Sequence, residues 1–168
     1  GVHRFLNRRE TVLASIEKHS PDVIGFQEAT NPMRLYLREE LAKRGYITVG
    51  CGRDANMRGE SVIVAYKHEN MELFSLENRW LSDTPLVAGS RFDGDQSRYA
   101  RIYTALVLKH KDADAPFLFI NTHLDHEGEN ARVRGAAVIK KRIAEIGLPF
   151  ILTGDMNALP DSAAIRSF

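Results

Sequence analysis

The sequence has 168 residues, and its 23 Lys and Arg residues against 22 Asp and Glu residues give a formal net charge of +1. This length predicts a single domain over residues 1–168, with enough chain to bury a core. The lone Cys51 excludes an intrachain disulfide, and no apolar run is long enough for a transmembrane helix. A reducing compartment such as the cytoplasm is therefore favoured. A secreted location stays open, because Gly1-Val2-His3 does not resemble a natural start.

The charge balance gives no indication of a nucleic-acid partner, although a local basic patch remains possible.

In chain order, residues 7–19 predict a helix with Val12, Leu13 and Ile16 on one face. Residues 22–28 predict a short buried strand. Asn31 and Pro32 indicate the N-cap and the first helical position of a second helix, which ends near Gly45.

The middle of the chain predicts three strands and a loop. Residues 46–51 and 61–66 are expected strands, and residues 71–76 could pair with the second of them. The stretch 78–96 contains many turn-forming residues and is expected to be a loop.

The last part alternates strands and helices. The pattern predicts strands at 98–109 and 116–122 with a turn at 111–114, a helix at 129–145, a strand at 150–153 and a helix capped by Asp161 or Ser162. This mixture indicates an α/β (α+β) protein in which helices cover β-sheets.

Three predicted strands end in polar groups. Glu28 ends the first, the segment Asn121 to His126 follows the second, and Asp155 and Asn157 follow the third. Ligands favour the carboxyl ends of strands in helix-covered sheets, so these groups could line one pocket. Two plainer interpretations stay open: a surface position for Glu28, and a backbone turn for Asp155 and Asn157.

The residue types indicate which metal such a pocket would bind. His123 and His126 could suggest zinc, but the sequence has one Cys and no helical His pair of the H-E-x-x-H kind. Oxygen ligands dominate instead, which favours Mg²⁺ or Mn²⁺.

Three segments carry a family resemblance: residues 22–28 (DVIGFQE), 121–126 (NTHLDH) and 154–158 (GDMNA). They resemble the core motifs of the endonuclease/exonuclease/phosphatase superfamily, and residues 80–85 (WLSDTP) are similar to a loop of its bacterial members. The resemblance implies a four-layer α/β/β/α sandwich of two mostly antiparallel sheets with helices outside. It also implies a divalent-metal-dependent hydrolase, in which water attacks the phosphorus of a phosphate ester in line.

The resemblance implies roles for individual side chains. Glu28 resembles the metal ligand, and Asp155 resembles the aspartate that orients or deprotonates the attacking water. Asn157 resembles the asparagine that donates to a phosphate oxygen, and His123 resembles the residue that contacts the scissile phosphate. Glu60 resembles a glutamate that pairs with that histidine, and such a partner would favour the imidazolium.

Three further expectations concern the surroundings of this set. Arg98 is expected to bind phosphate, with Arg101 as the other choice. Asp125 and His126 are expected to shape the pocket. The loop 78–96, with Trp80, Arg91 and Phe92, is the expected specificity element.

The sequence also departs from the family pattern. It lacks an opening strand that ends in asparagine and a closing Ser-Asp-His motif. We therefore expect this chain to lack its first strand and its C-terminal strands, and to be inactive alone. A catalytically inactive module that binds a phosphate-bearing partner is the alternative. The substrate stays open among nucleic acids, sugar or inositol phosphates and phospholipid head groups.

Overall fold

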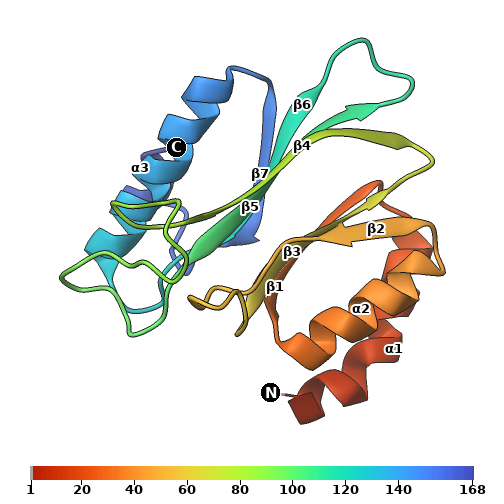
Figure 1. The fold of residues 1–168 in the computed structure, drawn as a ribbon, viewed down its shortest axis with the longest axis horizontal. Helices are drawn as coiled ribbons and strands as arrows, with labels where there is room; N and C mark the ends of the chain where they lie inside the picture. Colours follow the sequence, from red (N-terminus) through yellow and green to blue (C-terminus); the bar gives the residue numbers. More distant parts are fainter. Residues whose placement is uncertain (1) are drawn as a thin grey trace.

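The computed structural model describes residues 2–168 (Figure 1). Within this range the elements are α1 (Val2–His19), β1 (Val23–Ala29), α2 (Asn31–Ala42), β2 (Tyr46–Val49), β3 (Ser61–Lys67), β4 (Met71–Trp80), β5 (Ile102–His110), β6 (Phe117–His123), α3 (Glu129–Ile146), β7 (Phe150–Asp155) and α4 (Ala163–Arg166). No helix of the described range combines the length and the apolar character that a membrane span requires.

The strands form two sheets. In the described range, the first sheet has the order β1-β3-β2 and is antiparallel throughout. The second has the order β4-β5-β6-β7, in which β6 and β7 run parallel and the other pairs are antiparallel. The parallel register places His123 beside Asp155, so the ends of β6 and β7 meet at the same edge.

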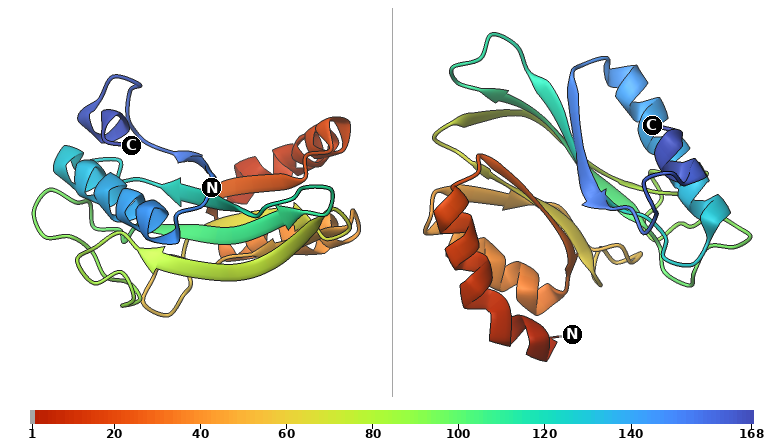
Figure 2. Two further views of the ribbon diagram at one scale, coloured as in Figure 1. Left: turned by 90° about the horizontal axis from the view of Figure 1, so that it is seen from above. Right: turned by 180° about the vertical axis from the view of Figure 1, so that it is seen from behind.

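The sheets face each other, and helices cover their outer sides (Figures 1 and 2). Helices α1 and α2 bury Phe5, Ile16 and Leu41 against the first sheet, and α3 buries Ile139 against the second. Between the sheets lies an apolar layer that includes Val64, Tyr66, Leu106, Leu108 and Phe119. The predicted four-layer sandwich of mostly antiparallel sheets is confirmed.

A buried amide joins the two sheets near the strand ends. The Nδ2 atom of Asn121, on β6, donates to the carbonyls of Phe26 (2.9 Å) and Ile63 (3.1 Å) in the other sheet. Its Oδ1 atom accepts hydrogen bonds from Gln27 Nε2 (2.6 Å) and Thr153 Oγ1 (3.1 Å). One fully buried side chain thereby aligns the ends of β1, β6 and β7.

Several predicted elements differ from the structure. Strand β4 pairs with β5, not with β3, and continues to Trp80 into the predicted loop 78–96. The chain crosses from one sheet to the other after Lys67, so the apolar residues of β3 and β4 face each other across the core. The strand predicted to start at residue 98 begins at Ile102, and the N-cap of α2 is Thr30.

Candidate active site

A cavity of about 210 Å³ lies at the edge where the strand ends meet. Its lining comprises Glu28, Arg53, Glu60, Tyr99, Arg101, His123, His126 and Asn157. Glu28 comes from β1, His123 ends β6, and Asn157 follows β7. The structure therefore brings residues from all three predicted strand ends to one cavity.

The backbone at Glu28 is in the left-handed region. Its φ is +56°, which an L-residue rarely adopts, and the register of β1 against β3 shifts between Phe26 and Ala29. Such a conformation persists only where the surrounding structure imposes it. Here the neighbouring Gln27 side chain is held by Asn121, and the side chain of Glu28 lines the cavity.

His123 is buried and uncharged near neutral pH. Burial lowers the pKa of its imidazole from 6.5 to about 4; the nearby Arg101 charge acts in the same direction and Asp155 opposes it. The Nε2 atom lies 3.8 Å from Oδ2 of Asp155. The expectation of an imidazolium at this position is wrong, because burial disfavours the charged form more than the Asp155 carboxylate favours it.

Glu60 does not pair with His123 as expected. Its Oε2 atom lies 2.8 Å from Nη1 of Arg53, an ion pair at the cavity wall. The backbone explains this partner, because the N–H of Arg53 donates to the carbonyl of Glu60 and sets the two residues side by side. Glu60 nevertheless lines the cavity, and the side chain of Arg53 supplies a largely buried cation.

Asp155 and Asn157 form a turn after β7, in which Asn157 lines the cavity while the exposed Asp155 is not among the lining residues. Oδ1 of Asp155 accepts the backbone N–H of Asn157 (2.9 Å), and Nδ2 of Asn157 donates to the carbonyl of Leu124 (3.0 Å). The φ of Asn157 is +46°, which asparagine tolerates better than most residues. The predicted turn is therefore present, and it directs Asn157 into the cavity.

The two candidate phosphate-binding arginines have different environments. Arg101 is buried and lines the cavity. Arg98, the favoured candidate, is exposed and donates to the hydroxyl of Tyr99 (2.5 Å), and it is not among the lining residues. Both residues precede β5, so neither lies in the strand that was predicted to start at residue 98.

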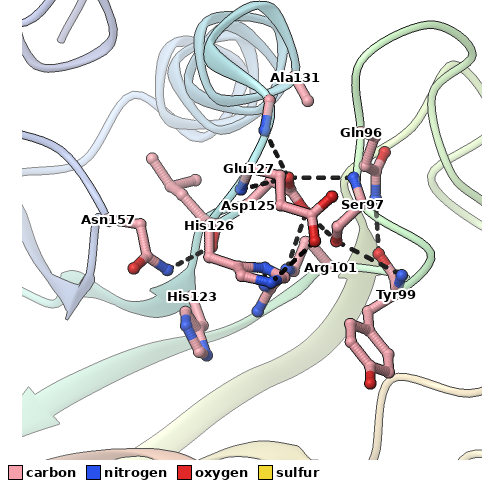
Figure 3. Close-up of polar contacts among 12 residues, drawn as sticks. Gln96, Ser97, Tyr99, Arg101, His123, Asp125, His126, Glu127, Ala131 and Asn157 are labelled. Carbon is pink, nitrogen blue, oxygen red and sulfur yellow. Dashed lines mark hydrogen bonds and ion pairs between the residues drawn. The ribbon is translucent and has the colours of Figure 1, made fainter.

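Asp125 and His126 take the expected positions around the cavity (Figure 3). His126 lines it, and Asp125 is buried behind it. Burial would raise the pKa of the Asp125 carboxyl, but hydrogen bonds from the Ser97 hydroxyl and from the backbone N–H groups of Gly128, Ser97 and Glu127 hold it well below its usual range. Asp125 is therefore a permanent anion at physiological pH.

The residues present fit a hard cation that is held through few protein ligands. Within residues 2–168 no three His, Cys, Asp or Glu side chains cluster as a complete metal cage. Glu28 offers one carboxylate in the cavity. Mg²⁺ commonly keeps several waters and takes one or two carboxylates together with substrate phosphate oxygens, so this donor set is compatible with it.

Sequence reasoning missed Arg53 and Tyr99. Arg53 lies in an irregular loop with no motif to mark it, and only the fold brings it to the wall. Tyr99 stands between Arg98 and Arg101 in the printed sequence. The guanidinium carbon of Arg53 lies 4.3 Å from the centroid of the Tyr99 ring. The presence of this aromatic residue between two arginines was the sequence signal that could have indicated Tyr99 as a site residue.

Comparison with known proteins gives consistent matches. Residues 2–168 match the sequence model of the Endonuclease/Exonuclease/phosphatase family. A structure of a family protein from Bacteroides thetaiotaomicron is 32% identical, with a TM-score of 0.90 over 98% of this chain and 59% of that chain. A mannosyl-6-phosphatase from the same species is 31% identical, with a TM-score of 0.90 over 98% of this chain and 61% of that chain.

A curated relative is also similar along almost the whole chain. It is an uncharacterized protein of Acanthamoeba polyphaga mimivirus, 27% identical over 94% of this chain and 60% of its own length. This chain thus spans about 60% of the length of each of the three relatives.

Proposed function

Because the chain belongs to the endonuclease/exonuclease/phosphatase family, we propose that the cavity at the ends of β1, β6 and β7 is the active site of a divalent-metal-dependent phosphoesterase. The family comprises metal-dependent phosphoesterases, among them nucleases and phosphatases. The observation that carries the proposal is the convergence of Glu28, His123 and Asn157, from two sheets, on one cavity with Arg101.

Glu28 is the residue that would hold the metal. Its carboxylate reaches the cavity from a constrained backbone, which limits the orientations available to it. A bound Mg²⁺ or Mn²⁺ would neutralise phosphate charge and stabilise the leaving oxygen.

Asp155 orients the attacking water. One carboxylate oxygen is engaged by the N–H of Asn157, while the other lies 3.8 Å from His123 Nε2. An unperturbed aspartate is a weak base at neutral pH, so its contribution is positioning as well as proton acceptance. Neutral His123 can donate one hydrogen bond to a phosphate oxygen from its buried position.

Asn157 and Arg101 bind the phosphate. One amide hydrogen of Asn157 is used by the carbonyl of Leu124, and the other can donate into the cavity. Asparagine suits this position because a carboxylate would repel the phosphate. Arg101 takes the role first expected of Arg98, since its guanidinium lies in the cavity wall. Such donors are most effective where charge develops in the transition state.

A sugar phosphate is the first substrate to test. A relative with 31% identity is a mannosyl-6-phosphatase, although this chain covers only 61% of it. The cavity of about 210 Å³ is lined by charged and polar side chains, and Tyr99 supplies a phenol ring to this lining. This mainly polar lining suits a small polar ester better than a lipid chain.

The test uses the parent protein with both ends restored, because this chain alone is expected to be inactive. It compares sugar phosphates, an aryl phosphate and an aryl phosphodiester with Mg²⁺, with Mn²⁺ and with EDTA. Release of phosphate that EDTA abolishes supports a phosphatase, and preference for the diester redirects the assignment to a phosphodiesterase or nuclease. Reaction in ¹⁸O-labelled water should place the label in the phosphate product, as attack at phosphorus requires. Binding of phosphate esters without any turnover would refute the enzyme and support an inactive binding module.

A further inference from the structure

The buried carboxylate of Asp125 organises one side of the cavity (Figure 3). Its Oδ1 atom accepts the backbone N–H groups of Ser97 (3.1 Å), Glu127 (3.0 Å) and Gly128 (2.8 Å). Its Oδ2 atom accepts the Ser97 hydroxyl (2.5 Å) and lies 3.3 Å from Nε of Arg101. The carboxylate therefore ties the segment before β5 to the turn after β6.

Arg101, which Asp125 orients, in turn contacts His126. With Nε directed to Asp125, its Nη2 atom lies 2.6 Å from Nδ1 of His126. Arginine has hydrogen-bond donors and no acceptor, so Nδ1 must be the unprotonated nitrogen of that imidazole. The bond at Nδ1 therefore favours the tautomer in which neutral His126 carries its hydrogen on Nε2. Nε2 lies 3.2 Å from Oε1 of the exposed Glu127, which favours hydrogen at the same nitrogen.

The cavity wall next to His126 is formed by Tyr99, which lies in the same segment before β5 that Asp125 anchors. The Tyr99 ring lies 6.2 Å from the His126 ring, between centroids, and the carbonyl of Tyr99 accepts from Gln96 Nε2 (2.9 Å). Both Tyr99 and His126 line the cavity. His126 is thus held on two sides, by the guanidinium of Arg101 and by the Tyr99 wall.

We infer that His126 is a specificity-determining residue whose Nε2–H turns from the exposed Glu127 carboxylate to an oxygen of the esterified group when substrate binds. Asp125, acting through Arg101, is the positioning residue that keeps Nδ1 unprotonated. The inference rests on the proposed function of the cavity. A fixed N–H donor beside the phosphate site favours an ester whose alcohol part has hydroxyl or ether oxygens, such as a sugar or polyol.

A purely structural role for Asp125 makes a different prediction. The first turn of α3 has another partner, because the N–H groups of Asn130 and Ala131 donate to the carboxylate of Asp95. Asp125 is therefore not required as the cap of that helix. If it only held the turn together, its loss would lower stability without altering the hydrogen position on His126.

The tautomer can be measured without turnover. Nitrogen NMR of histidine-labelled protein at mildly alkaline pH should show His126 with hydrogen on Nε2 only. Because the Glu127 carboxylate also favours hydrogen on Nε2, the variants are compared in a Glu127→Gln background. There Arg101→Met should introduce the Nδ1–H form, whereas Ser97→Ala, which leaves the Arg101–His126 bond in place, should not. An Nδ1–H signal in the wild type, or an unchanged tautomer on adding Arg101→Met to Glu127→Gln, would overturn the inference. The wild-type spectrum decides even if the variant does not fold.

The selectivity can be measured alongside it. His126→Phe should lower the ratio of kcat/KM for a sugar phosphate to kcat/KM for an aryl phosphate about tenfold, as expected for one lost hydrogen bond. Ser97→Ala should keep the wild-type ratio. An unchanged ratio in His126→Phe overturns the specificity role. Absence of phosphatase activity in the wild type would contradict the proposed function instead, and the NMR result would still decide the tautomer.

Discussion

The side chain of Asn121 joins the two sheets, and its replacement by aspartate tests that joint. Asn121→Asp keeps the shape and keeps an acceptor for Gln27 and Thr153. It replaces the Nδ2 donor by an oxygen that faces the carbonyls of Phe26 and Ile63. Because the site is fully buried, the folded variant should take up a proton there, so that one carbonyl regains a donor.

The magnitude follows from that proton. Protonating a carboxyl of ordinary pKa, about 3.9, costs about 4 kcal/mol at pH 7 and about 1.5 kcal/mol at pH 5. One hydrogen bond stays lost, at about 1 kcal/mol. We therefore expect the unfolding free energy to fall by about 5 kcal/mol at pH 7 and by about 2.5 kcal/mol at pH 5. The sign follows from the raised folded-state pKa: the folded variant holds a proton that the unfolded chain releases, so the penalty grows as the pH rises.

Urea denaturation followed by circular dichroism at both pH values measures this difference. Asn56→Asp is the matched control, because Asn56 is exposed and its Oδ1 acceptor for the N–H of Arg58 is retained in aspartate. The control should change stability little at either pH. A loss in Asn121→Asp that is below about 1 kcal/mol and independent of pH would refute the role of Asn121 as the joint between the sheets.

Three further predictions concern the cavity. The pKa of His123 is lowered to about 4, so the folded protein resists protonation there. The free energy of unfolding should therefore decline by about 3 kcal/mol as the pH falls from about 6.5 to 4. His123→Gln should flatten that part of a urea-derived stability profile, and an unchanged profile would contradict the buried neutral state. Glu28→Gln should raise the Mg²⁺ concentration required for half-maximal turnover, whereas the exposed Glu69→Gln should not; equal metal titrations would exclude Glu28 as the ligand. Double-mutant cycles on the free energy of unfolding should give a coupling of about 1 kcal/mol between Arg53 and Glu60 and close to zero between Glu60 and His123. The reverse pattern would support the pairing of Glu60 with His123 that the sequence predicted.

The strand ends were predictable because their signals are local. An apolar run that stops at polar residues marks a strand end wherever it occurs, and three such runs place Glu28, His123 and Asn157. The layer arrangement followed from the mixture of helices and strands together with the family resemblance. These features depend on short segments of chain, which a single sequence contains in full.

The remaining differences depend on contacts between distant segments. The short connection between β3 and β4 suggested pairing, but the apolar residues of both strands gain more burial by facing each other across the core. Nothing near Glu60 in the sequence indicates that Arg53 returns beside it through a backbone hydrogen bond. The choice between Arg98 and Arg101 depended on where β5 begins, and strand boundaries are weakly encoded in local sequence.

The measurement that tests the central claim most directly is metal-dependent phosphate release by Asp155→Asn. This variant keeps an oxygen for the N–H of Asn157, so the turn should persist while the carboxylate that orients the water is lost. We predict a loss in kcat of at least about 100-fold. The control Asp161→Asn changes another exposed aspartate, six residues further along the chain, and should retain wild-type turnover. If Asp155→Asn turned over as fast as Asp161→Asn, Asp155 would not orient the attacking water, and the mechanism proposed for the strand ends would be contradicted.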